Sequence, residues 1–90
     1  MRLDNFISDL GIVKRRTLAK ELADGGHITI NGNRAKPARK VKAGDIIDIS
    51  GKYRVKIRVI KVPESGSVAR GARAEYFEVL SKESSPDLDL

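Results

Sequence analysis

The sequence contains no cysteine and no tryptophan, and its single histidine is His27. Without cysteine the protein has neither a disulfide framework nor thiolate chemistry. One histidine cannot build the His and Cys ligand set of a zinc site, so we expect no metal and no cofactor. No apolar run approaches the roughly 20 residues of a membrane span, and the opening segment MRLDNF lacks the hydrophobic region of a signal peptide. A cytoplasmic protein without membrane contact is therefore expected.

Aromatic residues are also scarce, at 4% of the 90 residues. They are too scattered to form the platform on which base-stacking proteins hold nucleotides. Hydrophobic residues make up 40% of the chain, which is enough for one small aliphatic core but leaves little for the walls of a catalytic pocket. Gly44 to Gly51-Lys52 superficially resembles a phosphate-binding loop, yet six residues separate the glycines where four are needed. We expect no enzymatic activity.

Charge is abundant and unevenly distributed. The chain has 18 Lys and Arg against 12 Asp and Glu, a net charge of +6. Residues 1–80 carry 17 basic and 9 acidic side chains, a net +8, whereas residues 81–90 carry one lysine and three acids, a net −2. A basic domain of this size is typical of a protein that binds a polyanion, most often nucleic acid. The alternative is a surface kept soluble by its charge.

The first quarter of the chain has the periodicity of helices. Leu3, Phe6, Ile7 and Leu10 form one apolar stripe at helical spacing, which predicts a helix over 3–10 that ends at a glycine. A second helix is expected over about 14–24, where the Gly25-Gly26 pair stops it. In that helix Leu18 and Leu22 lie one turn apart and are expected to face the core.

The rest of the chain has the alternation of strands. Strands are expected over 27–30, 46–49, 54–62 and 75–80. Asn31-Gly32 predicts a tight hairpin through 33–36, and the slip of alternation at Val59-Ile60 predicts a bulge or a strand that leaves the sheet. Residues 63–74 are expected to form a loop. The pattern predicts an α+β fold, with two N-terminal helices packed on a small, mostly antiparallel sheet.

Basic residues gather at the expected start of the second helix. Lys14, Arg15 and Arg16 crowd a helix N-terminus, where the helix dipole is already positive. Their placement is explained if an anion such as a phosphate sits over the free N–H groups there, the alternative being a solvated basic turn. Arg16 and Lys20 are four residues apart and share one flank of the helix.

Two further basic clusters follow. One lies in and after the hairpin and consists of Arg34, Lys36, Arg39, Lys40 and Lys42. The other is the face of the long strand that carries Arg54, Lys56 and Arg58. Such a face is equally typical of a binding stripe and of the solvent side of a half-buried strand. Near the N-terminus, Asp4 suits the dipole of the first helix and is also expected to hold Arg2 in place.

These residues occur in the order that defines a known family. Arg2-Leu3-Asp4, Lys14-Arg15-Arg16, Ile30-Asn31-Gly32, Lys36-Pro37 and Gly44-Asp45 agree with it in both type and spacing. Over about residues 1–50 the sequence resembles the RNA-binding domain named after small-subunit ribosomal protein four. Its short length and the segment VKRRTLAKE resemble the stand-alone, ribosome-associated subgroup, which includes the fifteen-kilodalton heat-shock protein and the quality-control protein RqcP. One departure is Lys14, which is expected at the N-cap position where many members have serine.

The resemblance implies a fold, a partner and contacts. The fold is a helix pair on a small sheet (the alpha-L RNA-binding motif), with an RNA-binding domain over 1–80 and a core motif over 1–62. The polar, acidic composition of residues 81–90 separately predicts a disordered tail. The implied partners of a monomeric protein are 23S rRNA and peptidyl-tRNA on a large ribosomal subunit that has stalled, in quality control or heat-shock rescue. A general RNA-binding accessory protein or chaperone in rRNA or tRNA processing is the alternative. The implied RNA contacts are Arg2, Lys14, Arg15, Arg16, Lys20, Asn31, Lys36 and Lys40.

Overall fold

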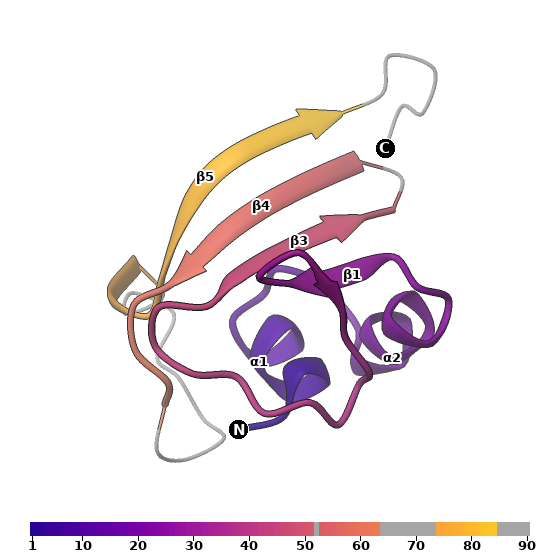
Figure 1. The fold of residues 1–90 in the computed structure, drawn as a ribbon, viewed down its shortest axis with the longest axis horizontal. Helices are drawn as coiled ribbons and strands as arrows, with labels where there is room; N and C mark the ends of the chain where they lie inside the picture. The colour runs from indigo at the N-terminus through magenta and orange to yellow at the C-terminus, as the bar shows by residue number, and fades with distance from the viewer. Residues whose placement is uncertain (52, 64–73, 85–90) are drawn as a thin grey trace.

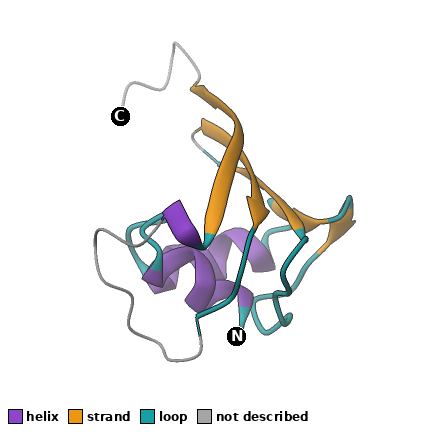
Figure 2. Cartoon of the chain, turned by 90° about the vertical axis from the view of Figure 1, so that its left-hand side faces the viewer, coloured by secondary structure: helices purple, strands orange, loops and turns teal. Residues whose placement is uncertain are grey.

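A computed structural model describes residues 1–51, 53–63 and 74–84. Within these residues two α-helices, α1 (Leu3–Asp9) and α2 (Arg16–Asp24), precede five strands. The strands are β1 (Ile28–Ile30), β2 (Asn33–Arg34), β3 (Ile46–Ser50), β4 (Tyr53–Val59) and β5 (Phe77–Ser84). They form one sheet in the order β2-β1-β3-β4-β5, and all four pairings are antiparallel. Both helices lie on the same side of the sheet (Figures 1 and 2), so the predicted α+β class is confirmed.

Helix α1 buries the stripe predicted for it. Leu3, Phe6 and Ile7 have no exposed surface and Leu10 is 1% exposed, and all four belong to the core. Gly11 follows with a φ of 73°, a left-handed conformation that favours glycine, and its N–H bonds the Ser8 carbonyl at 3.0 Å. A helix of seven residues is too short to persist alone in water, so this burial is what holds α1 together.

Helix α2 differs from its prediction in which side it buries. Ala19 is fully buried and Ala23 is 2% exposed, whereas Leu18 is 43% exposed and Leu22 is only half-buried. The expectation that Leu18 faces the core is therefore wrong, whereas Leu22 packs against the core as expected. The physical reason is packing against α1: alanine lets two helix backbones approach closely, and a leucine at the same place would hold them apart.

The hairpin between β1 and β2 confirms its prediction. Ile30 pairs with Asn33, which leaves Asn31 and Gly32 as a two-residue turn. Their φ angles are 53° and 84°, and positive values at both central residues are those of a type I′ turn, whose twist suits a hairpin. This turn determines the register that returns the chain toward residues 36–41.

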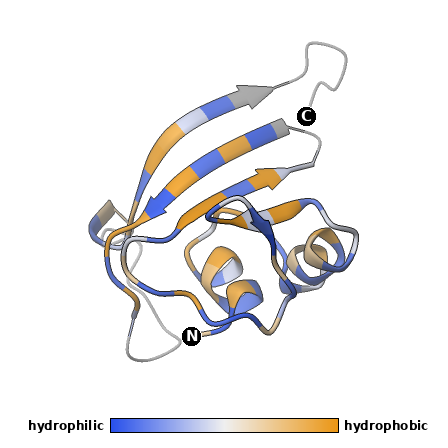
Figure 3. Cartoon of the chain, viewed as in Figure 1, coloured by the Kyte–Doolittle hydropathy of each residue, from blue (hydrophilic) through white to orange (hydrophobic). Residues whose placement is uncertain are grey.

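The long β4–β5 pair carries the irregularity expected near Val59. β4 ends at Val59, short of the predicted end at residue 62. The N–H groups of Ile60 and Lys61 both donate to the Tyr76 carbonyl, at 2.8 and 3.3 Å, so the pairing is irregular next to the predicted slip while the chain still contacts its neighbour. A bulge also lies in β5, because Lys56 pairs with Ser81 and Ile57 with Val79, which leaves Leu80 as the extra residue. Figure 3 shows apolar and polar positions alternating along β4.

Strand β5 continues to Ser84, past the boundary at residue 80 that the sequence predicted. The first four residues of the expected acidic tail pair with Tyr53–Lys56 of β4, so ladder hydrogen bonds outweigh their polar composition. The loop expected over 63–74 and the tail expected over 81–90 otherwise concern residues 64–73 and 85–90, which lie outside the described residues.

The corrected orientation of α2 leads to a paired prediction. Replacing Leu10 with alanine should lower the free energy of unfolding by about 2–5 kcal/mol, because it empties a fully packed site. Replacing Leu18 with alanine should cost less than about 1 kcal/mol, because much of that side chain is already in water. Urea denaturation of the two variants measures both values. A larger loss for Leu18→Ala than for Leu10→Ala would contradict the structure.

Candidate nucleic-acid interface

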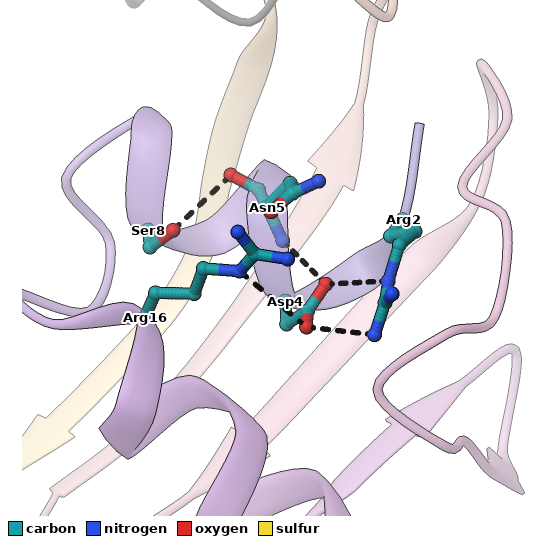
Figure 4. A network of polar contacts seen from close by, with 5 residues as sticks. All are labelled: Arg2, Asp4, Asn5, Ser8 and Arg16. Atoms are coloured by element: carbon teal, nitrogen blue, oxygen red, sulfur yellow. Dashed lines mark hydrogen bonds and ion pairs between the residues drawn. The ribbon is translucent and has the colours of Figure 1, made fainter.

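The start of α1 holds a buried carboxylate between two arginines. Asp4 is 1% exposed and accepts two hydrogen bonds from Arg2, from Nε at 3.2 Å and from Nη2 at 3.1 Å. Arg16 of α2 approaches the same carboxylate from the other side, with Nε 3.8 Å from Oδ2 (Figure 4). The expectation that Asp4 holds Arg2 is confirmed, and the carboxylate also ties the start of α2 to the start of α1.

The segment after the hairpin folds against this same end of α1. The N–H groups of Leu3 and Asp4 donate to the carbonyls of Arg39 and Pro37, at 2.8 and 3.2 Å. An antiparallel bridge pairs Arg2 with Lys40. Because residues opposite each other in such a bridge point to the same side, Lys40 extends beside Arg2.

A group of cations thus converges from three parts of the chain. We call Arg2, Arg16, Lys20 and Lys40 the cationic cluster: Arg2 and Arg16 share Asp4, Lys40 is paired with Arg2, and Lys20 follows Arg16 by one helical turn on the same flank. All four are exposed. Within residues 1–51, 53–63 and 74–84, Asp4 is the only carboxylate that forms an ion pair with this cluster.

Lys14 and Arg15 stand at the entrance to α2 rather than inside it. The helix begins at Arg16, and Arg15 is its N-cap, with φ −124° and ψ 137°. The sequence predicted that the helix starts near Lys14 and that Lys14 is its N-cap. Both predictions are wrong: the helix starts two residues later, and the N-cap is one residue later. The reason is the tight turn before it: the N–H groups of both Ile12 and Val13 donate to the Ile7 carbonyl, the chain bends through 12–14, and Arg15 is still extended.

This helix end is short of acceptors and rich in positive charge. No side chain caps it and its first turn has no acidic residue. Lys14 and Arg15 are exposed, and no ion pair joins either of them to a carboxylate in the described ranges. The unmet N–H groups and the dipole add to that charge, so the entrance to α2 has the electrostatics of an anion-binding surface.

Lys36 and Asn31 are the remaining two of the eight predicted RNA contacts, and their side chains are engaged differently. Lys36 is exposed and directly precedes Pro37, so it lies in the segment that contacts α1. Asn31 is also exposed, but its side chain is engaged within the protein: its Nδ2 donates to Asp45 at 3.0 Å and its Oδ1 accepts from the Ile46 N–H at 3.0 Å. These two hydrogen bonds hold the tip of the hairpin against the start of β3.

Sequence reasoning underrated one cation and missed one link. Arg39 is exposed in the segment that contacts α1, and only its place in the basic run after the hairpin marked it. The ion pair between Asp4 and Arg16 joins residues from two helices, and no sequence motif indicates how those helices are oriented. Arg34 is engaged elsewhere, because its Nη2 donates to the Asp24 carbonyl at the end of α2.

The comparisons with known proteins agree with this geometry. The S4 domain family matches residues 1–47, half of the chain. The chain belongs to the S4 domain family. It is 40% identical to the RQC P-site tRNA stabilizing factor of Bacillus subtilis (strain 168), over 92% of this chain and 94% of that protein. The predicted resemblance is confirmed.

Two solved structures share the fold of this S4 domain protein. Heat Shock Protein 15 of Vibrio cholerae, described as trimeric, superposes with a TM-score of 0.78 at 26% identity, over 90% of this chain and 82% of that one. The solution structure of the hypothetical protein HP1423 gives a TM-score of 0.77 at 34% identity, over 92% of this chain and all of the other. Both similarities extend over the sheet as well as the helix pair.

The outer face of the S4 domain sheet, opposite the helices, carries the third basic cluster, Arg54, Lys56 and Arg58. Here the arginines are paired with carboxylates. Asp48 accepts hydrogen bonds from Arg54 at 3.2 and 2.9 Å, and Arg58 pairs with Glu78 of β5. Lys56 stands between these pairs. Carboxylates neutralise the two arginines on this face. The geometry therefore favours the interpretation that this is the solvent side of a half-buried strand over the interpretation that it is a binding stripe.

None of the described helices is long and apolar enough to cross a membrane. Among the described residues, no three His, Asp or Glu side chains gather as a metal site requires.

The ion pair between Asp48 and Arg54 predicts a pH dependence of stability. The hydrogen bond from Arg54, opposed by partial burial and aided by the charges of Arg54 and Lys56, lowers the pKa of Asp48. A pKa that is lower in the folded state gives stability that is present above the unfolded value and is lost as the pH falls through the folded value.

Replacing Asp48 with asparagine should therefore destabilise the protein at neutral pH and have a diminishing effect below about pH 4. Thermal unfolding of the two proteins at both pH values measures the difference. An equal destabilisation in acid and at neutrality would show that the charge of Asp48 contributes nothing.

Proposed function

We propose that this S4 domain protein binds structured RNA on a large ribosomal subunit that carries stalled peptidyl-tRNA, and that it stabilises the P-site tRNA there. The observation that carries the proposal is the similarity, nearly end to end, to a protein named as an RQC P-site tRNA stabilizing factor. The cationic cluster supplies the physical means. The partners are 23S rRNA and tRNA, and the site of action is the cytoplasm.

The exposure of these cations suits them to bind phosphate. The cluster and the entrance to α2 present guanidinium and ammonium groups that are exposed, and these groups can take phosphate oxygens as partners at little desolvation cost. The proposed direct contacts are Arg2, Lys14, Arg15, Arg16, Lys20, Lys36 and Lys40. Asn31 contributes by holding the hairpin tip against Asp45 and Ile46.

The interface reads shape more than sequence. Its groups come from two helix starts and one extended segment that are tied together by the bonds to Asp4, Arg39 and Pro37, so their spacing is fixed before binding. A rigid array of cations suits the regular phosphate spacing of folded RNA, and backbone contacts give affinity and position without base discrimination. Affinity should fall steeply with salt, because each neutralised phosphate releases counterions.

The protein acts by binding and not by catalysis. Its stabilising effect on a bound tRNA needs no chemical step, only contacts that favour the occupied state. We propose that it does so as a monomer, since the cationic cluster is complete within one chain.

Sedimentation separates this proposal from a general RNA-binding role. The protein should migrate with large ribosomal subunits in a sucrose gradient, and most strongly with those that retain peptidyl-tRNA. Cross-linking in cells should map its bound nucleotides to 23S rRNA and tRNA. Migration with free tRNA alone would favour the accessory or chaperone role in RNA processing.

An arginine substitution in the cluster tests the surface itself. Replacing Arg16 with alanine should weaken binding to large ribosomal subunits by about 1–2 kcal/mol, because one charge-assisted contact is lost. The fold should persist, since Asp4 keeps its two hydrogen bonds from Arg2.

The matched control is Arg58→Ala, which removes the same charge from the outer face of the sheet. It should change affinity by a few tenths of a kcal/mol at most. Both affinities are measured at one fixed salt concentration, with circular dichroism to verify the fold. An equal loss in the two variants would move the RNA to the sheet face and contradict the proposal.

A further inference from the structure

We infer that Asp4 is a positioning residue of the RNA interface, and that its negative charge strengthens binding to a polyanion. The inference rests on the proposed function. By long-range electrostatics alone, the negative charge of Asp4 should weaken the binding of RNA. A carboxylate in the middle of a cationic cluster repels phosphate, so its presence there needs an explanation.

Burial separates the carboxylate from the surface that its partners form. The Asp4 side chain is 2% exposed, while the Arg2 and Arg16 side chains are 46% and 61% exposed. The anion is therefore covered by the two cations that it holds. An approaching phosphate meets the guanidinium groups first, and the repulsion from Asp4 is screened by their charge.

The two arginines keep donors for RNA while they are held. A guanidinium has five N–H groups. Arg2 gives two of them to Asp4, and Arg16 lies at 3.8 Å, the distance of an ion pair and beyond that of a hydrogen bond. Most of the N–H groups of both side chains thus remain available, in directions that the carboxylate fixes.

A purely structural role accounts for only part of the geometry. Asp4 lies in the first turn of α1 and accepts the Asn5 N–H at 2.8 Å, which suits the helix dipole and needs no arginine. A helix-start role does not explain why cations from two different elements converge on the carboxylate. Holding two long, flexible side chains in place removes entropy that they would otherwise lose on binding.

The direction in which Asp4→Asn changes the affinity for RNA distinguishes a positioning role from a simple effect of net charge. Asp4→Asn raises the net charge from +6 to +7, so charge alone predicts tighter binding to RNA. Loss of positioning predicts the opposite, a weakening of about tenfold, because charged hydrogen bonds to phosphate are lost. The slope of log affinity against log salt should also become shallower, by about 1 for each phosphate contact that is lost.

Asp48→Asn is the matched control. It makes the same chemical change and the same charge change at a carboxylate that is also paired with an arginine, but on the outer face of the sheet. Its affinity should equal or slightly exceed that of the unmodified protein. Asp4→Glu keeps the charge and displaces the carboxylate by one methylene, so it should also bind more weakly than the unmodified protein.

Binding is measured with purified bacterial large ribosomal subunits over a series of salt concentrations. Because the chain has no cysteine, one cysteine added at the C-terminus can carry a fluorescent dye. Circular dichroism and urea denaturation report the folded fraction of each variant. Partial unfolding would lower the apparent affinity and leave the salt slope unchanged, whereas loss of positioning changes the slope.

The possible results separate a failure of the proposed function from a failure of the inference on Asp4. If the unmodified protein does not bind the subunits, the proposed function fails. If it binds and Asp4→Asn binds as well as Asp48→Asn, or with an unchanged salt slope, the inference on Asp4 is overturned. Should Asp4→Asn fail to fold, Asp4→Glu decides, and an affinity equal to that of the unmodified protein would overturn the inference.

Discussion

The burial of one face of α1 is the constraint on which the rest of the molecule depends. Leu3, Phe6 and Ile7 are fully enclosed between the sheet and α2, and seven residues form a helix only because of that enclosure. Once α1 is fixed, its N-terminus becomes the place where the chain from Pro37 to Val41 docks by backbone hydrogen bonds. The same N-terminus presents Asp4 to Arg16. The core and the cationic cluster therefore both depend on the position of one short helix.

The two faces of the sheet divide the charge of the protein between them. On the outer face, Arg54 and Arg58 are neutralised by Asp48 and Glu78. The pair of Arg58 and Glu78 is exposed and contributes little to stability, whereas the half-buried Asp48 gives the pair with Arg54 a larger share. On the helix side, two arginines share a single carboxylate and the neighbouring cations are exposed. Net charge alone would not distinguish these surfaces, since both are rich in arginine and lysine. The supply of carboxylates distinguishes them.

Much of the fold could be predicted from the sequence because its signals are local. The stripe of α1 repeats within eight residues, and Asn31-Gly32 specifies its turn through the φ angles that those two residues tolerate. The orientation of α2 could not be predicted in this way. Leu18 is the more hydrophobic candidate for burial than Ala19, and only the close approach of α1 selects the smaller residue.

The same distinction between local and distant information applies to the candidate site. Runs such as Lys14-Arg15-Arg16 are visible in the sequence, but whether a cation is free depends on which acids lie near it in space. The pairing of Asp48 with Arg54 across two strands, and of Asp4 with Arg16 across two helices, are facts of packing. Strand β5 is similar, because its extension through Ser81–Ser84 is set by the ladder to β4 and not by composition.

The uncapped start of α2 has a consequence for the protein away from its ligand. With Arg15 at the N-cap and no acidic residue in the first turn, the first N–H groups of this helix receive no acceptor from a capping side chain, and the positive end of the helix dipole repels the cations beside it. Arg16 is held by its ion pair with Asp4, but hydrogen exchange of these first amides should be fast in the free protein. An RNA phosphate over those amides would slow the exchange, because it supplies the acceptor that no capping side chain provides.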